Sequence, residues 1–144
     1  MTFDGLLDSN VLIAALNPEH VHHAESEALA RRDGRYAIAA HSLAETYCSL
    51  TRFPYHRPPE EAWAAVAALR ARTELRSLTA DQQYDAIRQF AGRGLAGPLL
   101  CDALIGEVAR VHRIRAIITW NTRHMAGLFP DLRVLTPAQQ FGRA

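Results

Sequence analysis

The feature that most constrains the fold is the alternation of short strand-like runs with stretches of helical periodicity. Runs that fit buried strands occur at residues 5–7, 36–40, 74–78, 116–119 and 133–135. Helical stretches lie between them, at 11–16, 22–32, 42–52, 79–91 and 102–112, with another opened by prolines 58 and 59 and a short one after Thr136. Strands joined by helices form parallel sheets that are covered on both faces. The sequence therefore predicts an α/β fold, a three-layer sandwich whose central, mostly parallel sheet has about five strands.

Length and composition favour one domain in a reducing compartment. We expect residues 1–144 to form a single domain, since the chain is long enough to bury a core and shows no repeat or linker. The net charge of +1 argues against a general polyanion-coating protein but allows a local basic groove. The two cysteines, Cys48 and Cys101, fit neither a disulfide scaffold nor a zinc ribbon, and we expect both to be buried. Without a signal peptide or a membrane-spanning run, a cytoplasmic location is expected.

Lone polar residues mark the junctions between elements. Asp8 follows the first strand, Glu45 lies a few residues past the second, Asp102 opens the helix before the fourth, and Asn121 follows that strand. The carboxyl ends of parallel strands meet at one edge of the sheet, where ligands bind. A buried Asp is costly unless it is paired or bound to a cation, and magnesium prefers carboxylates, waters and phosphate oxygens. The spacing thus predicts a site for a hard divalent cation.

Each of these side chains also has a purely structural interpretation. Asp8 and Asn121 could each cap the helix that follows. Glu45 stands three residues after Ser42, which is the spacing of a capping box. Asp102 could simply complement the dipole of its helix. Their joint occurrence favours the functional interpretation because its order is that of the family resemblance described next.

Four segments support a family resemblance. They are Leu7-Asp8-Ser9-Asn10-Val11-Leu12, Ser42-Leu43-Ala44-Glu45, Asp102-Ala103-Leu104-Ile105 and Thr119-Trp120-Asn121-Thr122-Arg123-His124-Met125. In this order, and over essentially the whole chain, they resemble the PIN-domain family and within it the VapC toxins of bacterial toxin–antitoxin pairs. The resemblance implies a metal-dependent endoribonuclease that leaves 5′-phosphate and 3′-hydroxyl ends. It also implies a homodimer and inhibition by a VapB-type antitoxin.

The resemblance assigns roles to individual residues. Asp8 and Asp102 would bind the ion directly, and Glu45 would bind it through water or orient the attacking water. Many PIN domains carry an Asp where this chain has Asn121, which keeps an oxygen ligand but loses the charge. A single Mg²⁺ (or Mn²⁺), completed by substrate phosphates, is therefore expected. Ser9 and Asn10 are expected to hydrogen-bond an acid or a metal-bound water, or else only to start the helix.

Residues near the loops are candidates for RNA contact. Four arginines could bind RNA phosphates or be ordinary solvated surface, namely Arg52, Arg57, Arg93 and Arg123. Tyr55 and Trp120 could stack on an unpaired base, although packing against the protein is the simpler role for Trp120. The seven histidines do not form a set with the spacing of zinc ligands.

The function expected from these features is a magnesium-dependent endoribonuclease toxin that cleaves structured RNA, such as transfer or ribosomal RNA loops, and so inhibits translation. A housekeeping PIN nuclease of RNA or DNA processing is one alternative. A catalytically silent PIN-like binding module is another. A phosphatase with Asp8 as nucleophile fits less well, because the second acid that such enzymes usually need is Asn10 here.

Overall fold

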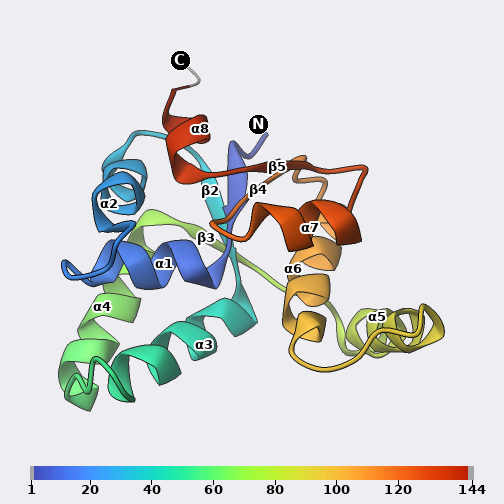
Figure 1. Cartoon of the computed structure of the whole chain (residues 1–144), viewed down its shortest axis with the longest axis horizontal. Helices are drawn as coiled ribbons and strands as arrows, with labels where there is room; N and C mark the ends of the chain where they lie inside the picture. Colours follow the sequence, from blue (N-terminus) through green and yellow to red (C-terminus); the bar gives the residue numbers. More distant parts are fainter. Residues whose placement is uncertain (1, 143–144) are drawn as a thin grey trace.

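A five-stranded, fully parallel sheet forms the centre of the computed structural model, which describes residues 2–142. Its strands are β1 (Gly5–Leu7), β2 (Tyr36–Ala39), β3 (Glu74–Arg76), β4 (Ala116–Ile118) and β5 (Arg133–Leu135). They lie in the order β3-β2-β1-β4-β5, with β1 in the middle (Figure 1). The predicted α/β class and the number of strands are confirmed.

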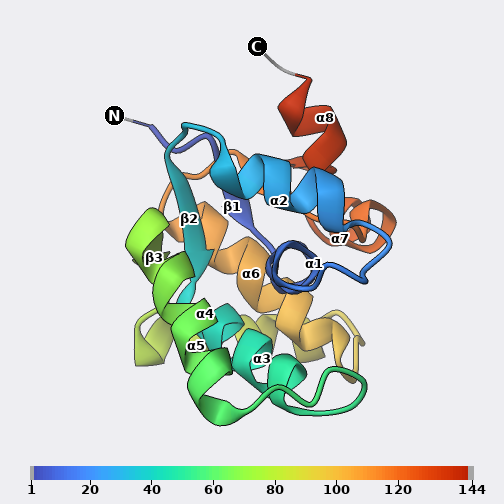
Figure 2. The same ribbon diagram turned by 90° about the vertical axis from the view of Figure 1, so that its left-hand side faces the viewer.

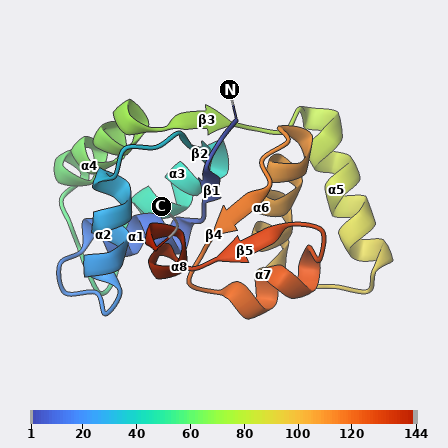
Figure 3. The same ribbon diagram turned by 90° about the horizontal axis from the view of Figure 1, so that it is seen from above.

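Helices cover both faces of the sheet. They are α1 (Ser9–Leu16), α2 (His23–Arg31), α3 (Ala40–Thr51), α4 (Pro59–Arg72), α5 (Ala80–Gly92), α6 (Leu99–Val111), α7 (Thr122–Leu128) and α8 (Pro137–Phe141). Figure 2 shows α1, α2 and α4 in front of β1 and β2, with α6 behind them. Seen from above, α2 and α4 lie at one end of the molecule and α5 at the other (Figure 3).

The alternation of side chains along each strand divides the core in two. Leu6, Ala37 and Ile117 pack with α6 and α7 in one cluster, and Leu7 and Ile38 pack with α1, α2 and α4 in the other. All five side chains are at most 3% exposed. Because a strand covered on both faces must be apolar at every position, the central strands β1 and β4 contain no polar residue, whereas the edge strands β3 and β5 carry charged ones.

The topology brings distant parts of the chain to one edge. Leu7, the last residue of β1, pairs with Ile38 of β2 on one side and Ile118 of β4 on the other. The chain leaves β1, β2 and β4 at this shared carboxyl edge and enters α1, α3 and the turn before α7. The residues that follow these strands are therefore neighbours in space.

The structure corrects the predicted start of α3. This helix begins at Ala40, directly after β2, so Ser42 lies inside the helix and is fully buried rather than acting as its cap. The proposed capping box between Ser42 and Glu45 is wrong for the same reason. A short link is possible because Ala39 is extended (φ −66°, ψ 135°) and the chain turns at a small residue.

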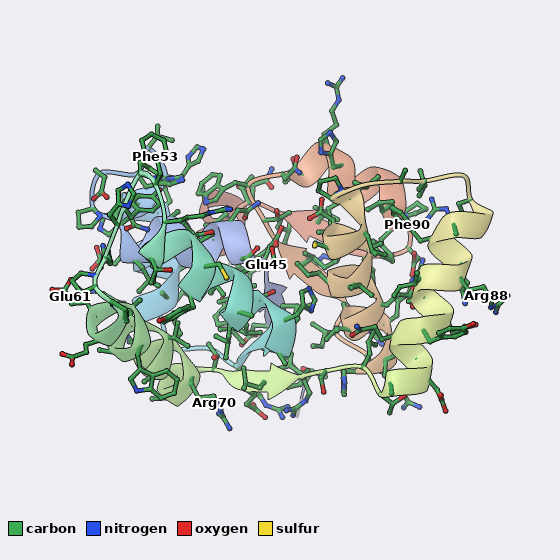
Figure 4. The ribbon with its side chains drawn as sticks, turned by 90° about the horizontal axis from the view of Figure 1, so that it is seen from below. Glu45, Phe53, Glu61, Arg70, Arg88 and Phe90 are labelled. Carbon is green, nitrogen blue, oxygen red and sulfur yellow. The ribbon has the colours of Figure 1, made fainter. Side chains whose placement is uncertain are left out.

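The predicted burial of the two cysteines is also wrong. Cys48 and Cys101 are exposed instead of buried. On α5 the buried side chains are Ala86 and Phe90, whereas Tyr84 and Ile87 are 75% and 41% exposed. Figure 4 shows Phe90 between α5 and α6. Trp63 of α4 is 66% exposed, so the outer face of this helix carries a large apolar side chain.

Within residues 2–142, none of the helices is both long enough and apolar enough to cross a bilayer.

Candidate active site

Asp8 is held at the carboxyl end of β1 by several hydrogen bonds. It is the N-cap of α1, and its Oδ1 accepts from the backbone N–H of Ser9 at 2.7 Å. Its Oδ2 accepts from the hydroxyl of Thr119 at 2.8 Å. The side chain is only 3% exposed, and this burial raises its pKa although both neighbours lower it. The capping interpretation is thus confirmed, but a cap alone does not require a buried carboxylate.

Glu45 and Asp102 complete a cluster of three carboxylates with Asp8. Burial, and then the negative charge of Asp8, raise the pKa of Glu45. Burial, followed by the charges of Asp8 and Glu45, raises the pKa of Asp102 to about 6. Like charges shift each other's pKa in this way only at short range. The structure therefore brings together the three acids that the sequence analysis selected, one at the N-cap of α1, one in α3 and one in the first turn of α6. Figure 4 shows Glu45 near the middle of the face seen from below.

Ser9 links two of these acids. Its hydroxyl lies 3.3 Å from Asp8 Oδ1 and 3.4 Å from Glu45 Oε2, so it can donate to either carboxylate. The second oxygen of Glu45, Oε1, is buried and has no hydrogen-bond partner within residues 2–142. An unpaired buried carboxylate oxygen is costly, which indicates that a further positively charged or hydrogen-donating group fits here.

The hydroxyl of Thr119 orients Asp8, a role that the sequence analysis missed. It accepts from Asn10 Nδ2 and from the backbone N–H of Asn121, both at 3.0 Å. A hydroxyl has two acceptor lone pairs and one proton, so these two bonds direct the proton to Asp8. Asn10 accordingly supports Thr119 and the backbone of Trp120 rather than contacting an acid. The available signal was a lone polar residue directly after a buried strand.

His41 is a second neighbour of the acids that was not predicted. Its Nε2 is buried without a hydrogen bond and lies 3.7 Å from Glu45 Oε1. Burial lowers its pKa, and a hydrogen bond with the backbone of Cys101, followed by the charge of Asp8, offsets this in part. The spacing of four residues before Glu45 places both side chains on one face of α3, and this spacing was readable in the sequence.

The side chain of Asn121 bonds His124 and not the carboxylates. It occupies the N-cap position of α7, but its side chain makes no capping hydrogen bond. Its Nδ2 lies 3.0 Å from Nδ1 of His124. The side chain forms no hydrogen bond with Asp8, Glu45 or Asp102 within the described residues, so its predicted catalytic role stays a prediction.

The arginines proposed to contact RNA differ in their surroundings. Arg52, Arg93 and Arg123 are exposed. Arg57 instead donates from Nη2 to the carbonyl of Leu16 at 2.5 Å and to Asn17 Oδ1 at 2.9 Å, which fastens the loop after α3 to the end of α1. Arg57 therefore has a structural role whether or not it also contacts RNA.

Trp120 packs against the protein, as its simpler interpretation predicted. Its ring stacks on that of His22 with 3.8 Å between centroids, and its Nε1 donates to Ser26 Oγ at 2.8 Å. These contacts tie the turn after β4 to the start of α2.

The three acids differ from a preformed metal site but have the chemistry of one. Among residues 2–142, no group of three or more His, Cys, Asp or Glu side chains is already placed as a set of metal ligands. The chemistry of the pocket nevertheless suits one, because a divalent cation would relieve the mutual repulsion of the acids and satisfy Glu45 Oε1. Asp8, Glu45 and Asp102 are the residues that would hold it.

Comparisons with known proteins identify the family. The family model described as "PIN domain" matches residues 5–126, so this chain belongs to the PIN domain family. A comparison with curated protein sequences gave no match.

Solved structures share the fold. VapC20 of Mycobacterium tuberculosis, described as a sarcin-ricin loop cleaving toxin, is 22% identical over 85% of this chain and 93% of its own, with a TM-score of 0.69. DNA-bound VapBC of Salmonella typhimurium is 23% identical over 95% and 99%, with a TM-score of 0.67. A toxin–antitoxin complex from Klebsiella pneumoniae is 23% identical over 92% and 97%, with a TM-score of 0.62.

The raised pKa of Asp102 predicts a pH-dependent stability in metal-free protein. A carboxyl whose pKa is about 6 when folded, but ordinary when unfolded, stabilises the fold below pH 4 and loses this contribution as the pH rises through 6. In EDTA, the Tm of the wild type should therefore fall relative to that of Asp102→Asn between pH 4 and 7. If the three acids hold magnesium, the ion should reduce this fall, because only the ionised form would bind it. Parallel Tm curves for the two proteins would contradict the prediction.

Removing the hydroxyl of Thr119 should loosen Asp8. Thr119→Val keeps the shape but leaves one oxygen of a buried carboxylate unpaired, which should cost about 1–3 kcal/mol of unfolding free energy. Affinity for Mn²⁺, measured by calorimetry, should fall about 10- to 100-fold, as for other residues that orient metal ligands. Thr119→Ser retains the hydroxyl and is the control. Equal metal affinity in the Val and Ser variants would exclude an orienting role.

Proposed function

We propose that this chain is a metal-dependent endoribonuclease and the toxin of a VapBC-type toxin–antitoxin pair. The observation that carries the proposal is the convergence of Asp8, Glu45 and Asp102 at the carboxyl edge of the sheet, each with a raised pKa. Membership of the PIN domain family supports it. The toxins among the structures that share the fold also support it, VapC20 included.

The chain's own residues have distinct parts in this proposal. When bound, Mg²⁺ or Mn²⁺ would lower the pKa of a water and offset the charge that develops on the cleaved phosphate. Asp8, fixed by Thr119 and Ser9, would hold the ion in one orientation. Glu45 is partly exposed as a whole, and its buried oxygen Oε1, which has no hydrogen-bond partner among the described residues, would orient the attacking water. Asp102 supplies the third negative charge.

The similarity to solved toxin structures also supports a proposal for the substrate and the partners. We propose structured RNA as the substrate, cut within an unpaired loop of transfer or ribosomal RNA, whose bases a protein can reach. The proposed partner is a VapB-type antitoxin, since VapBC of Salmonella typhimurium is such an assembly. An antitoxin arginine could pair with the carboxylates through two parallel hydrogen bonds and so block the pocket. We also propose a homodimer in the cytoplasm.

A silent PIN-like binding module is the alternative with a specific observation in its favour. Asn121 replaces an acid with a neutral amide and forms no hydrogen bond with the three carboxylates in the described structure. A housekeeping nuclease is a further possibility, which the RNA target would reveal.

The test is induced expression of the wild type and of Asp8→Ala in a bacterium, with sequencing of RNA 5′ ends. We expect growth arrest and new 5′-phosphate ends at a small set of sites only with the wild type. Equal toxicity from both proteins, or the absence of new ends, would refute the nuclease proposal. Cleavage of many messenger and precursor RNAs without growth arrest would favour a housekeeping nuclease.

A further inference from the structure

A group of arginines lies at the amino-terminal edge of β4 and β5, opposite the edge that carries the acids. Arg113 and Arg115 lie in the link between α6 and β4, and Arg133 is the first residue of β5. With Arg110 they line a shallow hollow of about 470 Å³ whose apolar lining is Ala109, Ile114 and Leu132. We call this surface the arginine hollow.

The positive charge of the hollow is not compensated within the structure. Its one acid, Asp131, is bound by Arg110, whose Nε lies 2.9 Å from Oδ2 and whose Nη2 contacts Oδ1. The side chains of Arg113, Arg115 and Arg133 form no hydrogen bond or ion pair with any residue in the range 2–142. Arg115 and Arg133 are also adjacent, since the N–H of Arg133 donates to the carbonyl of Arg115 at 2.9 Å. Neighbouring like charges repel, so the hollow favours an anionic ligand.

The backbone at Arg113 is a second, independent observation. The N–H of Ile114 donates to the carbonyl of Ala109 and that of Arg113 to Arg110, which is the Schellman motif that ends many helices. Arg113 occupies its left-handed position with φ 58°, where glycine is preferred because a side chain is unfavourable there. The chain therefore accepts local strain at the position where it places a charge beside the hollow.

The geometry relates the hollow to the acids through α6. Asp102 lies in the first turn of this 13-residue helix, and Arg113 lies two residues beyond its end (Figure 1). At 1.5 Å per residue the helix is about 20 Å long. A folded RNA is longer than this, so one molecule can contact both places. A guanidinium fork also matches phosphate oxygens better than an ammonium does, and all 16 basic residues of this chain are arginine.

We propose that the arginine hollow binds backbone phosphates of the RNA substrate at a distance from the cleaved bond. This inference rests on the proposed nuclease function and adds a second contact surface to it. Because the hollow lies away from the acids, it contributes to RNA affinity and leaves the chemical step unchanged. It is also separate from Arg52, Arg57, Arg93 and Arg123.

The test compares two triple variants in an Asp8→Asn background, in which RNA can be bound without being cut. One carries Arg113→Gln, Arg115→Gln and Arg133→Gln. The matched control removes three exposed arginines from α4 and α5 with the same change in charge, as Arg70→Gln, Arg72→Gln and Arg88→Gln. Affinity for a fluorescein-labelled transfer RNA is measured by anisotropy from 50 to 200 mM salt, with thermal melts to establish folding.

We expect the hollow variant to bind at least about tenfold more weakly at low salt, with a salt slope smaller by about 2, as for the loss of three phosphate contacts. The control should stay within about twofold of the Asp8→Asn protein. In an otherwise wild-type chain, the same hollow substitutions should raise KM and leave kcat unchanged. The inference would be overturned if both triple variants lost RNA affinity equally, or if the hollow variant bound RNA as tightly as the Asp8→Asn protein. It would also be overturned if the hollow variant lost antitoxin binding but kept RNA binding.

A single variant separates charge from folding. Arg113→Gly removes the charge and relieves the positive φ, so it should be at least as stable as the wild type and still bind RNA more weakly. Unchanged RNA affinity in this more stable protein would count against the hollow. Failure of the proposed nuclease function can be told apart from failure of this inference. In the first case the wild type itself cleaves no RNA, whereas in the second it cleaves RNA and the hollow variants bind RNA as tightly as the wild type.

Discussion

Asp8→Asn is expected to lower kcat/KM for RNA cleavage by at least about a thousandfold while the protein stays folded. The substitution removes one charge from the centre of the carboxylate cluster, and with it the strongest attraction for a divalent ion. Asn remains a good N-cap, so the start of α1 is retained. Losing the hydrogen bond from Thr119 lowers the free energy of unfolding, and removing a buried charge raises it, so the two effects offset each other. The Tm in EDTA should thus stay within about 5 °C of the wild type.

This prediction is checked by single-turnover cleavage of a labelled RNA at saturating magnesium, together with melts in EDTA. Asp81→Asn, which removes an exposed acid from the first turn of α5, serves as the control and should cleave RNA at the wild-type rate. A fall in activity accompanied by an equal fall in the folded fraction would show that Asp8 matters only as a cap.

Gly106→Ala is expected to produce the largest loss of stability of any glycine-to-alanine substitution in this chain, about 3 kcal/mol or more. A Cβ at Gly106 would lie 1.9 Å from Cε2 and 2.1 Å from Cζ of Phe129. The ring is 2% exposed and packs in the core cluster beside α6, so it cannot move aside without displacing its neighbours. In an open helix the same change would stabilise by up to about 1 kcal/mol.

Gly127→Ala supplies the matched control, because Gly127 is also helical and has nothing within 4 Å of its potential Cβ. Urea unfolding of the two variants should give shifts of opposite sign. If Gly106→Ala unfolded at the same urea concentration as the wild type, the close approach of α6 to Phe129 would not be required for the fold.

The positions of the strands and of the acids could be predicted from sequence because both follow from local rules. A short apolar run before a polar residue predicted Gly5–Leu7, and the same rule placed Asp8 at the carboxyl edge. The parallel arrangement then places Glu45 and Asp102 near Asp8. The charge of Asp8 accordingly raises the pKa of both side chains. Such inferences depend on the pattern of elements and not on the details of packing.

What the sequence did not predict depends on three-dimensional neighbours. The inward face of α5 is set by its contact with α6, and that contact selects Phe90 over Tyr84. The roles of Thr119 and His41 arise from contacts across the sheet edge and along α3, and no single motif contains them. The start of α3 at Ala40 depends on how tightly the chain can turn after β2, which Ser42 obscured by resembling a cap.

The wide separation of the acids along the chain has a consequence for synthesis. Asp8 and Glu45 belong to the first third of the sequence, whereas Asp102 and the hydroxyl that orients Asp8 come from residues 102 and 119. The first strand also lies at the centre of the sheet and needs β4 beside it. A growing chain that has not yet produced α6 and β4 has neither a complete set of charges nor a fixed Asp8. By this order of assembly, the nuclease we propose cannot damage the ribosomal RNA around it until most of its own translation is finished.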